Sequence, residues 1–91
     1  MATLRERVLS GETTFGSSLS MASPAAAEIV GQAGFDWLVI DTEHGMSTET
    51  TLLPQLYAVG TTGATALVRI ERSDRLRVSR ALDIGAGGLV V

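Results

Sequence analysis

Trp37-Leu38-Val39-Ile40, followed at once by Asp41-Thr42-Glu43-His44-Gly45, is the stretch that decides the fold of this chain. Four consecutive apolar residues predict a strand buried on both faces, which is typical of a parallel sheet. The polar residues that follow predict a loop at the carboxyl end of this strand. Because parallel α/β proteins bind their ligands at that end of the sheet, we expect the functional site in this loop.

Strands and helices are predicted to alternate on both sides of this stretch. Strands are expected at residues 14–19, 37–40, 64–70 and 88–91, and helices at residues 3–9, 24–30, 47–60 and 74–84. Ser23 and Pro24 are a typical N-cap and first helical residue, with Gly31 or Gly34 ending that helix. Ser73 is expected to cap the last helix, and Gly85 to end it.

The fold class expected from this order is α/β, with about four parallel strands that alternate with helices in right-handed βαβ units. The last strand would leave an unpaired sheet edge at Val91. A complete (β/α)8 barrel takes about 250 residues, whereas this chain has 91. We therefore expect residues 1–91 to be the N-terminal part of a TIM (β/α)8 barrel, a partial domain truncated at its C-terminus.

The composition excludes several classes of function. The net charge is −3 and no basic stretch could neutralise a run of phosphates, so nucleic-acid binding is not expected. The chain has no cysteine, which excludes disulfides and thiolate metal sites. It also has no lysine, so these residues cannot form a Schiff base with a carbonyl substrate. The arginines that follow the third strand are interpreted as a solvated helix face: Arg72, Arg75, Arg77 and Arg80.

The lengths and positions of the apolar runs predict where the protein is located. No apolar run approaches the roughly 20 residues of a membrane span. Charges at Arg5, Glu6 and Arg7 occupy the place where a signal peptide needs its apolar stretch. A soluble, cytoplasmic protein without a membrane partner is expected.

Polar side chains follow two neighbouring strands of the predicted sheet and are expected to converge. His44 is the only histidine of the chain, and a histidine can exchange a proton near neutral pH, as a general base must. Asp41 and Glu43 could orient it, bind water or support a metal from its outer shell, or they could simply solvate the loop. Arg69 interrupts an apolar strand, so its guanidinium is expected either to face a carboxylate or enolate oxygen or to form a salt bridge.

Two features near the end of the chain carry weaker signals. Asp83 lies in the last turn of a predicted helix, where the helix dipole mildly disfavours a negative charge. This departure suggests a role, although exposed aspartates tolerate such positions. The glycine-rich residues 85–88 are not a dinucleotide-binding loop, because they follow a helix and open a strand, the reverse of that fingerprint.

Segments covering most of the chain resemble the HpcH/HpaI aldolase family in their order and spacing: Gly34-Phe35-Asp36-Trp37, Asp41-Thr42-Glu43-His44-Gly45, Leu67-Val68-Arg69 and Leu82-Asp83-Ile84-Gly85-Ala86. This family includes 4-hydroxy-2-oxo-heptanedioate and 2-dehydro-3-deoxyglucarate aldolases. The resemblance implies a metal-dependent class II pyruvate aldolase, a carbon–carbon lyase of aromatic or sugar-acid catabolism. It also implies that His44 is the base, Arg69 the transition-state stabiliser and Asp83 the residue that raises the basicity of the histidine.

The resemblance further implies what lies outside these residues. The family holds its divalent ion (Mg, Mn or Co) through a glutamate and an aspartate on later strands, so the metal ligands are expected beyond Val91. The expected partners are a keto acid, an aldehyde and further copies of the chain, one of which would have to bring Asp83 to His44 unless the local geometry is unusual. The isolated chain is expected to be inactive.

Two alternative functions stay open at this point. The first is a citramalyl-CoA or malyl-CoA type lyase of the same fold. The second is a non-catalytic barrel fragment that assembles with partners, since exposed strand edges need something to cover them.

Overall fold

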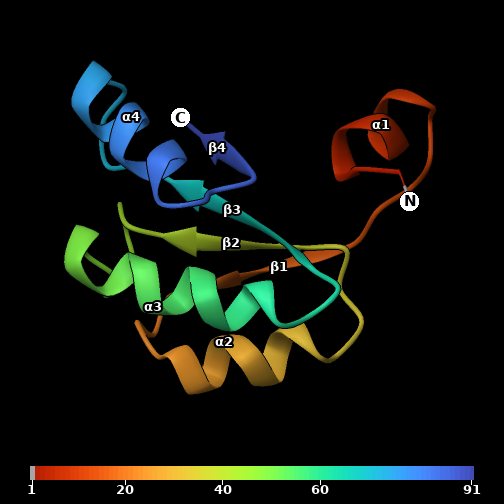
Figure 1. Cartoon of the computed structure of the whole chain (residues 1–91), viewed down its shortest axis with the longest axis horizontal. Helices are drawn as coiled ribbons and strands as arrows, with labels where there is room; N and C mark the ends of the chain where they lie inside the picture. The colour runs from red at the N-terminus through yellow and green to blue at the C-terminus, as the bar shows by residue number, and fades with distance from the viewer. Residues whose placement is uncertain (1) are drawn as a thin grey trace.

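The structure is a computed structural model that describes residues 2–91, so Met1 of the expected domain 1–91 lies outside the described residues. Helices and strands alternate along the chain as predicted (Figure 1): α1 (Leu4–Leu9), β1 (Gly16–Leu19), α2 (Pro24–Gly31), β2 (Trp37–Asp41), α3 (Glu49–Gly60), β3 (Thr65–Arg69), α4 (Arg75–Asp83) and β4 (Gly88–Val90). The expected α/β class is therefore confirmed. No helix among residues 2–91 has both the length and the apolar character needed to cross a bilayer.

The four strands form one parallel sheet in the order β1-β2-β3-β4, so strands that are consecutive in the chain are neighbours in space. The register brings Asp41 of β2 beside Arg69 of β3, so these two strands end level with each other. At the other end of β2, Trp37 pairs with Gly16, where an added Cβ would lie 2.0 Å from the Trp37 ring. The indole therefore occupies the space that a side chain at Gly16 would need.

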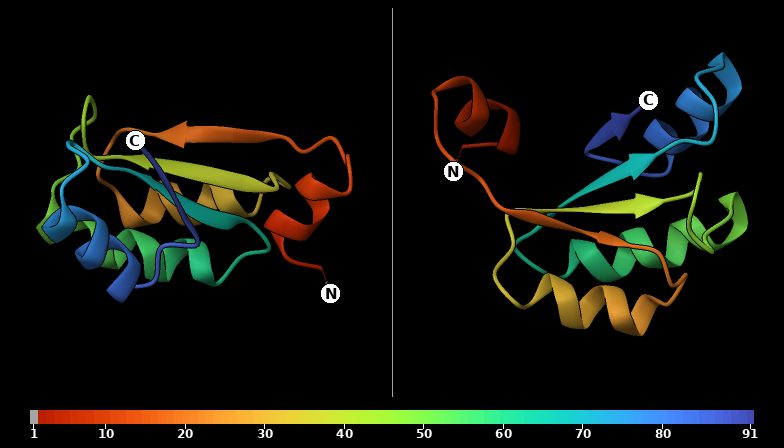
Figure 2. Two further views of the ribbon diagram at one scale, coloured as in Figure 1. Left: turned by 90° about the horizontal axis from the view of Figure 1, so that it is seen from above. Right: turned by 180° about the vertical axis from the view of Figure 1, so that it is seen from behind.

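Three helices, α2, α3 and α4, cover one face of the sheet, and no helix among residues 2–91 covers the other (Figure 2). Leu38 and Ile40 are fully buried beneath these helices. Because side chains alternate along a strand, Val39 and Asp41 point to the uncovered face. That face is where Asp41 and Arg69 meet.

The core lies between the sheet and the three helices and is built from aliphatic side chains, as the low aromatic content predicts. Leu52, Leu56 and Val59 of α3 pack onto the strands. They recur at the spacing of an amphipathic helix, which explains why α3 forms along the sheet. Burial of this aliphatic layer fixes the level of the helices relative to the carboxyl ends of the strands.

The predicted helix ends hold in three cases and fail in one. α2 ends at Gly31, one of the two glycines expected to end it. Ser23 caps α2, accepting a hydrogen bond from the Ala26 amide at 3.1 Å, and Gly85 follows α4 with a φ of +111°. The predicted cap of the last helix, Ser73, is wrong. Asp74 caps α4 instead, accepting a hydrogen bond from the Arg77 amide at 2.9 Å. Both residue types cap helices well, so packing decides which of two adjacent residues does so.

Candidate active site

Asp41, the last residue of β2, organises the loop that follows it, residues 41–48, which we call the Asp41 loop. One carboxylate oxygen, Oδ1, accepts hydrogen bonds from the Glu43 and His44 amides, both at 2.9 Å. The other, Oδ2, lies 3.3 Å from Arg69 Nη1. Burial of Asp41 raises the pKa of its carboxyl, but the two amides and the guanidinium outweigh burial and hold that pKa below its ordinary value.

Arg69 joins both carboxylates of the site. Its Nη1 faces Asp41, and its Nε lies 3.3 Å from Glu43 Oε1. Its carbonyl oxygen accepts hydrogen bonds from the Thr42 amide at 3.0 Å and the Thr42 hydroxyl at 2.6 Å. The Arg69 side chain is 40% exposed, so a bound anion can still approach it beside its two protein partners.

His44 stands at the exposed rim of this cluster. Its Nδ1 lies 3.3 Å from Glu43 Oε1, the same oxygen that faces Arg69 Nε. The His44 side chain is 68% exposed, so a bound molecule can approach its ring. Asp41, Glu43, His44 and Arg69 are thus brought together by the ends of two adjacent strands, as their positions in the sequence predict.

The Asp41 loop is also held along its length. The Met46 amide donates to the Ser20 carbonyl at 2.8 Å, which ties the loop to the end of β1. A Cβ at Gly45 would lie 2.7 Å from the Asp41 carbonyl oxygen, so the loop passes too close to its own backbone for any side chain there. Ser47, at the end of the loop, is buried and accepts a hydrogen bond from Gln55 of α3 at 2.8 Å.

Asp83 is not part of this cluster. It is the last residue of α4, after which the chain returns to the start of β3, where the Gly87 amide donates to the Ala66 carbonyl. Asp83 therefore lies at the amino edge of the sheet, opposite to His44. Within one copy of the chain the two residues do not meet, and the predicted role of Asp83 stays a prediction that requires a second copy.

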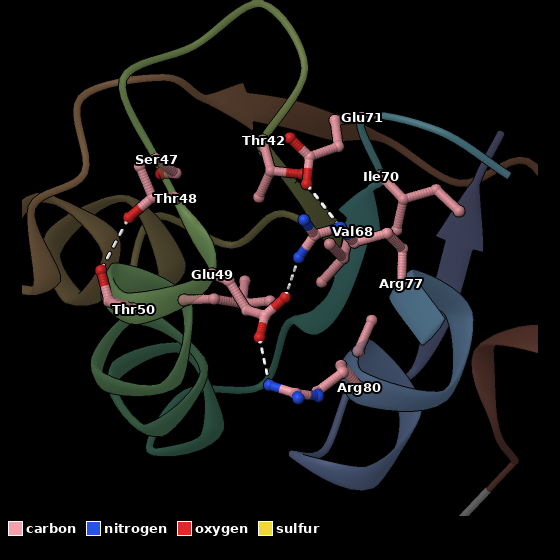
Figure 3. A pocket seen from close by; sticks show the side chains of 12 residues that line it. Thr42, Ser47, Thr48, Glu49, Thr50, Val68, Ile70, Glu71, Arg77 and Arg80 are labelled. Atoms are coloured by element: carbon pink, nitrogen blue, oxygen red, sulfur yellow. Dashed lines mark hydrogen bonds and ion pairs between the residues drawn. The ribbon is translucent and has the colours of Figure 1, made fainter. Parts of the chain in front are cut away.

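A pocket of about 310 Å³ opens at the carboxyl edge between the first turns of α3 and α4 (Figure 3). Glu49 lies between two arginines of α4, forming an ion pair with Arg77 and another with Arg80 at 2.6 Å. Arg77 Nε also lies 2.8 Å from Glu71. The interpretation of these arginines as a solvated face is wrong for Arg77, whose side chain is only 27% exposed, because the two helix starts converge here.

This pocket and the His44 cluster occupy different sides of the sheet. Val68, Ile70 and Leu52 line the pocket, and they belong to the helix-covered core. His44, Asp41 and Arg69 do not line it. The single histidine of the chain lies in the cluster, whereas the two arginines that line the pocket, Arg77 and Arg80, are already paired with Glu49.

Two residues that shape this edge were not singled out in the sequence. Glu49 could be recognised only as an acidic residue in the first turn of a helix, which is common at any helix start. Gln55 gave a clearer signal, because it is an amide within the apolar spacing of residues 47–60. Neither residue type indicates its partner without the packing of α3.

A metal site is not formed by the described residues alone. No group of three or more histidine, aspartate or glutamate side chains among residues 2–91 is placed to hold an ion. The oxygens of Asp41 are already engaged by two amides and by Arg69, and Glu43 faces Arg69 and His44.

Comparison with curated proteins finds relatives that are sugar-acid aldolases. The chain is 39% identical over 74 residues to the 5-keto-4-deoxy-D-glucarate aldolase of Klebsiella pneumoniae, and 40% identical to that of Salmonella arizonae. In both cases the match covers 81% of this chain but 29% of the relative. The chain therefore spans less than a third of the length of these curated relatives.

Solved structures give the same result for the fold. An HpcH/HpaI aldolase/citrate lyase family protein from Burkholderia cenocepacia superposes with a TM-score of 0.87 at 35% identity, covering 94% of this chain and 35% of its own. The HpcH/HpaI aldolase from Desulfitobacterium hafniense gives 0.85 at 30% identity, covering 100% and 36%. A citrate synthase, SbnG, gives 0.86 at 29% identity, covering 96% and 36%.

The two HpcH/HpaI neighbours are TIM-barrel proteins, so the expectation that the strands and helices form part of a (β/α)8 barrel is confirmed. The HpcH/HpaI aldolase/citrate lyase family matches residues 15–91, which include every strand and the whole His44 cluster. The chain belongs to the HpcH/HpaI aldolase/citrate lyase family.

Proposed function

We propose that this chain supplies the acid–base histidine and the anion-stabilising arginine of an aldolase that cleaves a 4-hydroxy-2-oxo acid into pyruvate and an aldehyde. The observation that supports this most directly is the placement of His44 and Arg69 on one carboxylate oxygen, Glu43 Oε1, each at 3.3 Å. A proton acceptor and a fixed positive charge thereby lie side by side at the carboxyl edge of the sheet. Retro-aldol cleavage needs both groups.

In the proposed reaction His44 takes the proton of the 4-hydroxyl group. The C3–C4 bond breaks, its electron pair forms the enolate of pyruvate, and the former C4 becomes the carbonyl of the aldehyde. Arg69 is placed to stabilise negative charge on the substrate, because its exposed guanidinium retains donors toward the open side of the cluster. The protonated His44 returns this proton, directly or through water, to C3 of the enolate, which completes pyruvate and restores the neutral imidazole.

Glu43 and Asp41 are assigned supporting roles in this scheme. Glu43 faces Nδ1 of His44, and a carboxylate at that position orients the ring so that Nε2 points to the substrate. Asp41 holds the backbone of the Asp41 loop and keeps Arg69 at the strand end. Neither carboxylate is free to act as the proton acceptor, because both are engaged with Arg69.

The family resemblance adds a divalent cation to the proposal. When bound, such an ion polarises the 2-oxo group of the substrate and favours the enolate. The residues described here do not form its ligand set. We propose that its ligands lie outside residues 2–91, that the enzyme is a soluble cytoplasmic homo-oligomer, and that Asp83 acts on His44 of a neighbouring copy.

The test is to measure pyruvate release from 4-hydroxy-2-oxo acids by the whole enzyme that contains this chain. His44→Ala is expected to lower kcat by a factor of about 100 to 10,000, the usual value of general acid–base catalysis. Gln32→Ala is a suitable control, because this exposed side chain lies at the end of α2, far from the loop. Unchanged kcat in His44→Ala would remove the histidine from the mechanism.

The family description, aldolase/citrate lyase, and the similarity to the citrate synthase SbnG support a second candidate function. In this second function the chain would help to break or form a carbon–carbon bond in a citrate-like or acyl-CoA substrate. Parallel assays with citramalyl-CoA, malyl-CoA and citrate separate it from the aldolase. The aldolase is favoured because the curated relatives named above are aldolases. Turnover of a thioester in preference to every 4-hydroxy-2-oxo acid would reverse that choice.

A further inference from the structure

Gln55 links α3 to the loop that carries His44. Its Nε2 donates a hydrogen bond to the Ser47 hydroxyl at 2.8 Å and another to the Thr51 carbonyl at 3.0 Å. Gln55 is fully buried and Ser47 is 3% exposed, so water does not compete for this contact. The bridge joins the second turn of the helix to the last residues of the Asp41 loop.

Burial of the Gln55 side-chain amide at this position is unfavourable for the stability of the fold. Its neighbours on the same face of α3, Leu52, Leu56 and Val59, are all buried and aliphatic. Gln55 Oε1 has no hydrogen-bond partner among residues 2–91, and a buried carbonyl oxygen without a donor destabilises the fold. An apolar side chain would fill the position without that penalty, so packing alone does not explain a glutamine here.

The bridge acts on a loop whose conformation decides where His44 points. The His44 side chain is 68% exposed, and among residues 2–91 it has one polar contact, to Glu43, which is itself in the loop. The backbone must therefore place the imidazole. The loop backbone is held at three points. Asp41 accepts the His44 amide at the start of the loop, the Ser20 carbonyl accepts the Met46 amide, and Gln55 bonds to Ser47, three residues after His44.

We propose that Gln55 is a positioning residue, which acts through Ser47 to hold the Asp41 loop so that His44 meets its substrate. The proposal rests on the proposed function of His44 as the proton acceptor. Gln55 lies in the core of the helix layer and does not touch the substrate. Its effect is on the placement of the imidazole, and a displacement of about 1 Å can lower a rate about a hundredfold.

The test compares Ser47→Ala, Gln55→Met and the double variant of the whole enzyme with Val59→Ala. Val59 is also fully buried in α3 but lies near its far end, so Val59→Ala destabilises the same helix without touching the loop. Each bridge variant is expected to lower kcat about tenfold to a hundredfold at near-constant KM. The double variant should be no worse than either single one, and Val59→Ala should keep wild-type kcat per folded molecule.

A second readout does not depend on turnover. Hydrogen exchange of the Met46 amide, which is bonded to Ser20, is expected to accelerate at least tenfold in Ser47→Ala and Gln55→Met but not in Val59→Ala. If the wild-type enzyme cleaved no 4-hydroxy-2-oxo acid, the proposed function would fail, and this exchange rate would still decide the role of Gln55. Unchanged Met46 exchange together with kcat within twofold of wild type in Ser47→Ala would overturn the positioning role.

Discussion

Asp41 and Arg69 are register partners at the carboxyl ends of β2 and β3, and Asp41 Oδ2 lies 3.3 Å from Arg69 Nη1. The remaining oxygen of Asp41 accepts the amides of Glu43 and His44, so one carboxylate holds both the arginine and the loop that carries the histidine. This arrangement depends on parallel pairing, because only parallel strands bring both polar ends to one edge.

Arg69→Lys is expected to preserve the fold and to lower activity strongly. A lysine ammonium cannot face Asp41 and Glu43 with two nitrogens of a planar fork and still present donors to a substrate anion. We expect kcat to fall by a factor of about 100 to 1,000, as for loss of a donor to a developing oxyanion. Steady-state kinetics measure the loss of activity, and a thermal melt followed by circular dichroism checks that the fold is preserved. A kcat close to that of the wild type would exclude a role of Arg69 in charge stabilisation.

Gly45→Ala is expected to disturb the Asp41 loop, whereas Gly60→Ala is not. A methyl at Gly45 would meet the Asp41 carbonyl oxygen at 2.7 Å, and relief of this clash should cost about 1–3 kcal/mol of stability and also reduce kcat. Nothing lies within 4 Å of a methyl at Gly60, the last residue of α3. Alanine there should be neutral or stabilise the helix by up to about 1 kcal/mol. Equal unfolding midpoints for the two variants would contradict the close approach at Gly45.

Lowering the pH is expected to weaken the contacts by which Asp36 attaches α1 to the sheet. The Phe15 amide, at 2.8 Å, and then Arg7, at 2.7 Å, hold the pKa of the Asp36 carboxyl below its ordinary value. Because the pKa of Asp36 is lower in the folded state, its carboxylate stabilises the fold fully above the pKa that it has in the unfolded chain, about 3.9. This stabilisation is lost as the pH falls through the lower, folded value.

The measurement is the denaturation midpoint as a function of pH. Asp36→Asn should destabilise the protein near neutral pH and show a flatter decline below about pH 4, the ordinary range of an aspartate. Glu28→Gln serves as the control, because the Glu28 side chain is exposed and makes no ion pair within residues 2–91. Parallel curves for wild type and Asp36→Asn would show that this carboxylate is not held by Phe15 and Arg7.

Removal of divalent ions should abolish activity of the whole enzyme without unfolding this part of it. No group of three or more potential ligands is found among residues 2–91, and we expect their secondary structure to be unchanged when the ion is removed. Pyruvate release after exhaustive chelation, with re-addition of Mg, Mn or Co, tests the first point. Circular dichroism of the 91-residue chain with and without the ion tests the second, and this isolated chain is expected to be inactive. Full turnover after chelation would exclude the metal.

The local sequence was sufficient for the order of elements and for the location of the candidate site. The apolar run at residues 37–40 predicts a buried strand, and Ser23 with Pro24 predicts a helix start, because both signals depend on near neighbours. The position of His44 directly after that strand places it at the ligand-binding edge of any parallel sheet. These inferences require no knowledge of which side chains touch.

Only the tertiary structure decided the partners of the polar groups. The sequence suggested Ser73 as the helix cap, whereas the structure has Asp74 there. The sequence also could not show that Glu49 pairs with Arg77, or place Gln55 against Ser47. Such contacts depend on how far each helix slides along the sheet before its aliphatic face is buried. They also decide which predicted residues form one site: Arg69 joins His44 through Glu43, whereas Asp83 lies at the opposite edge because α4 runs antiparallel to the strands.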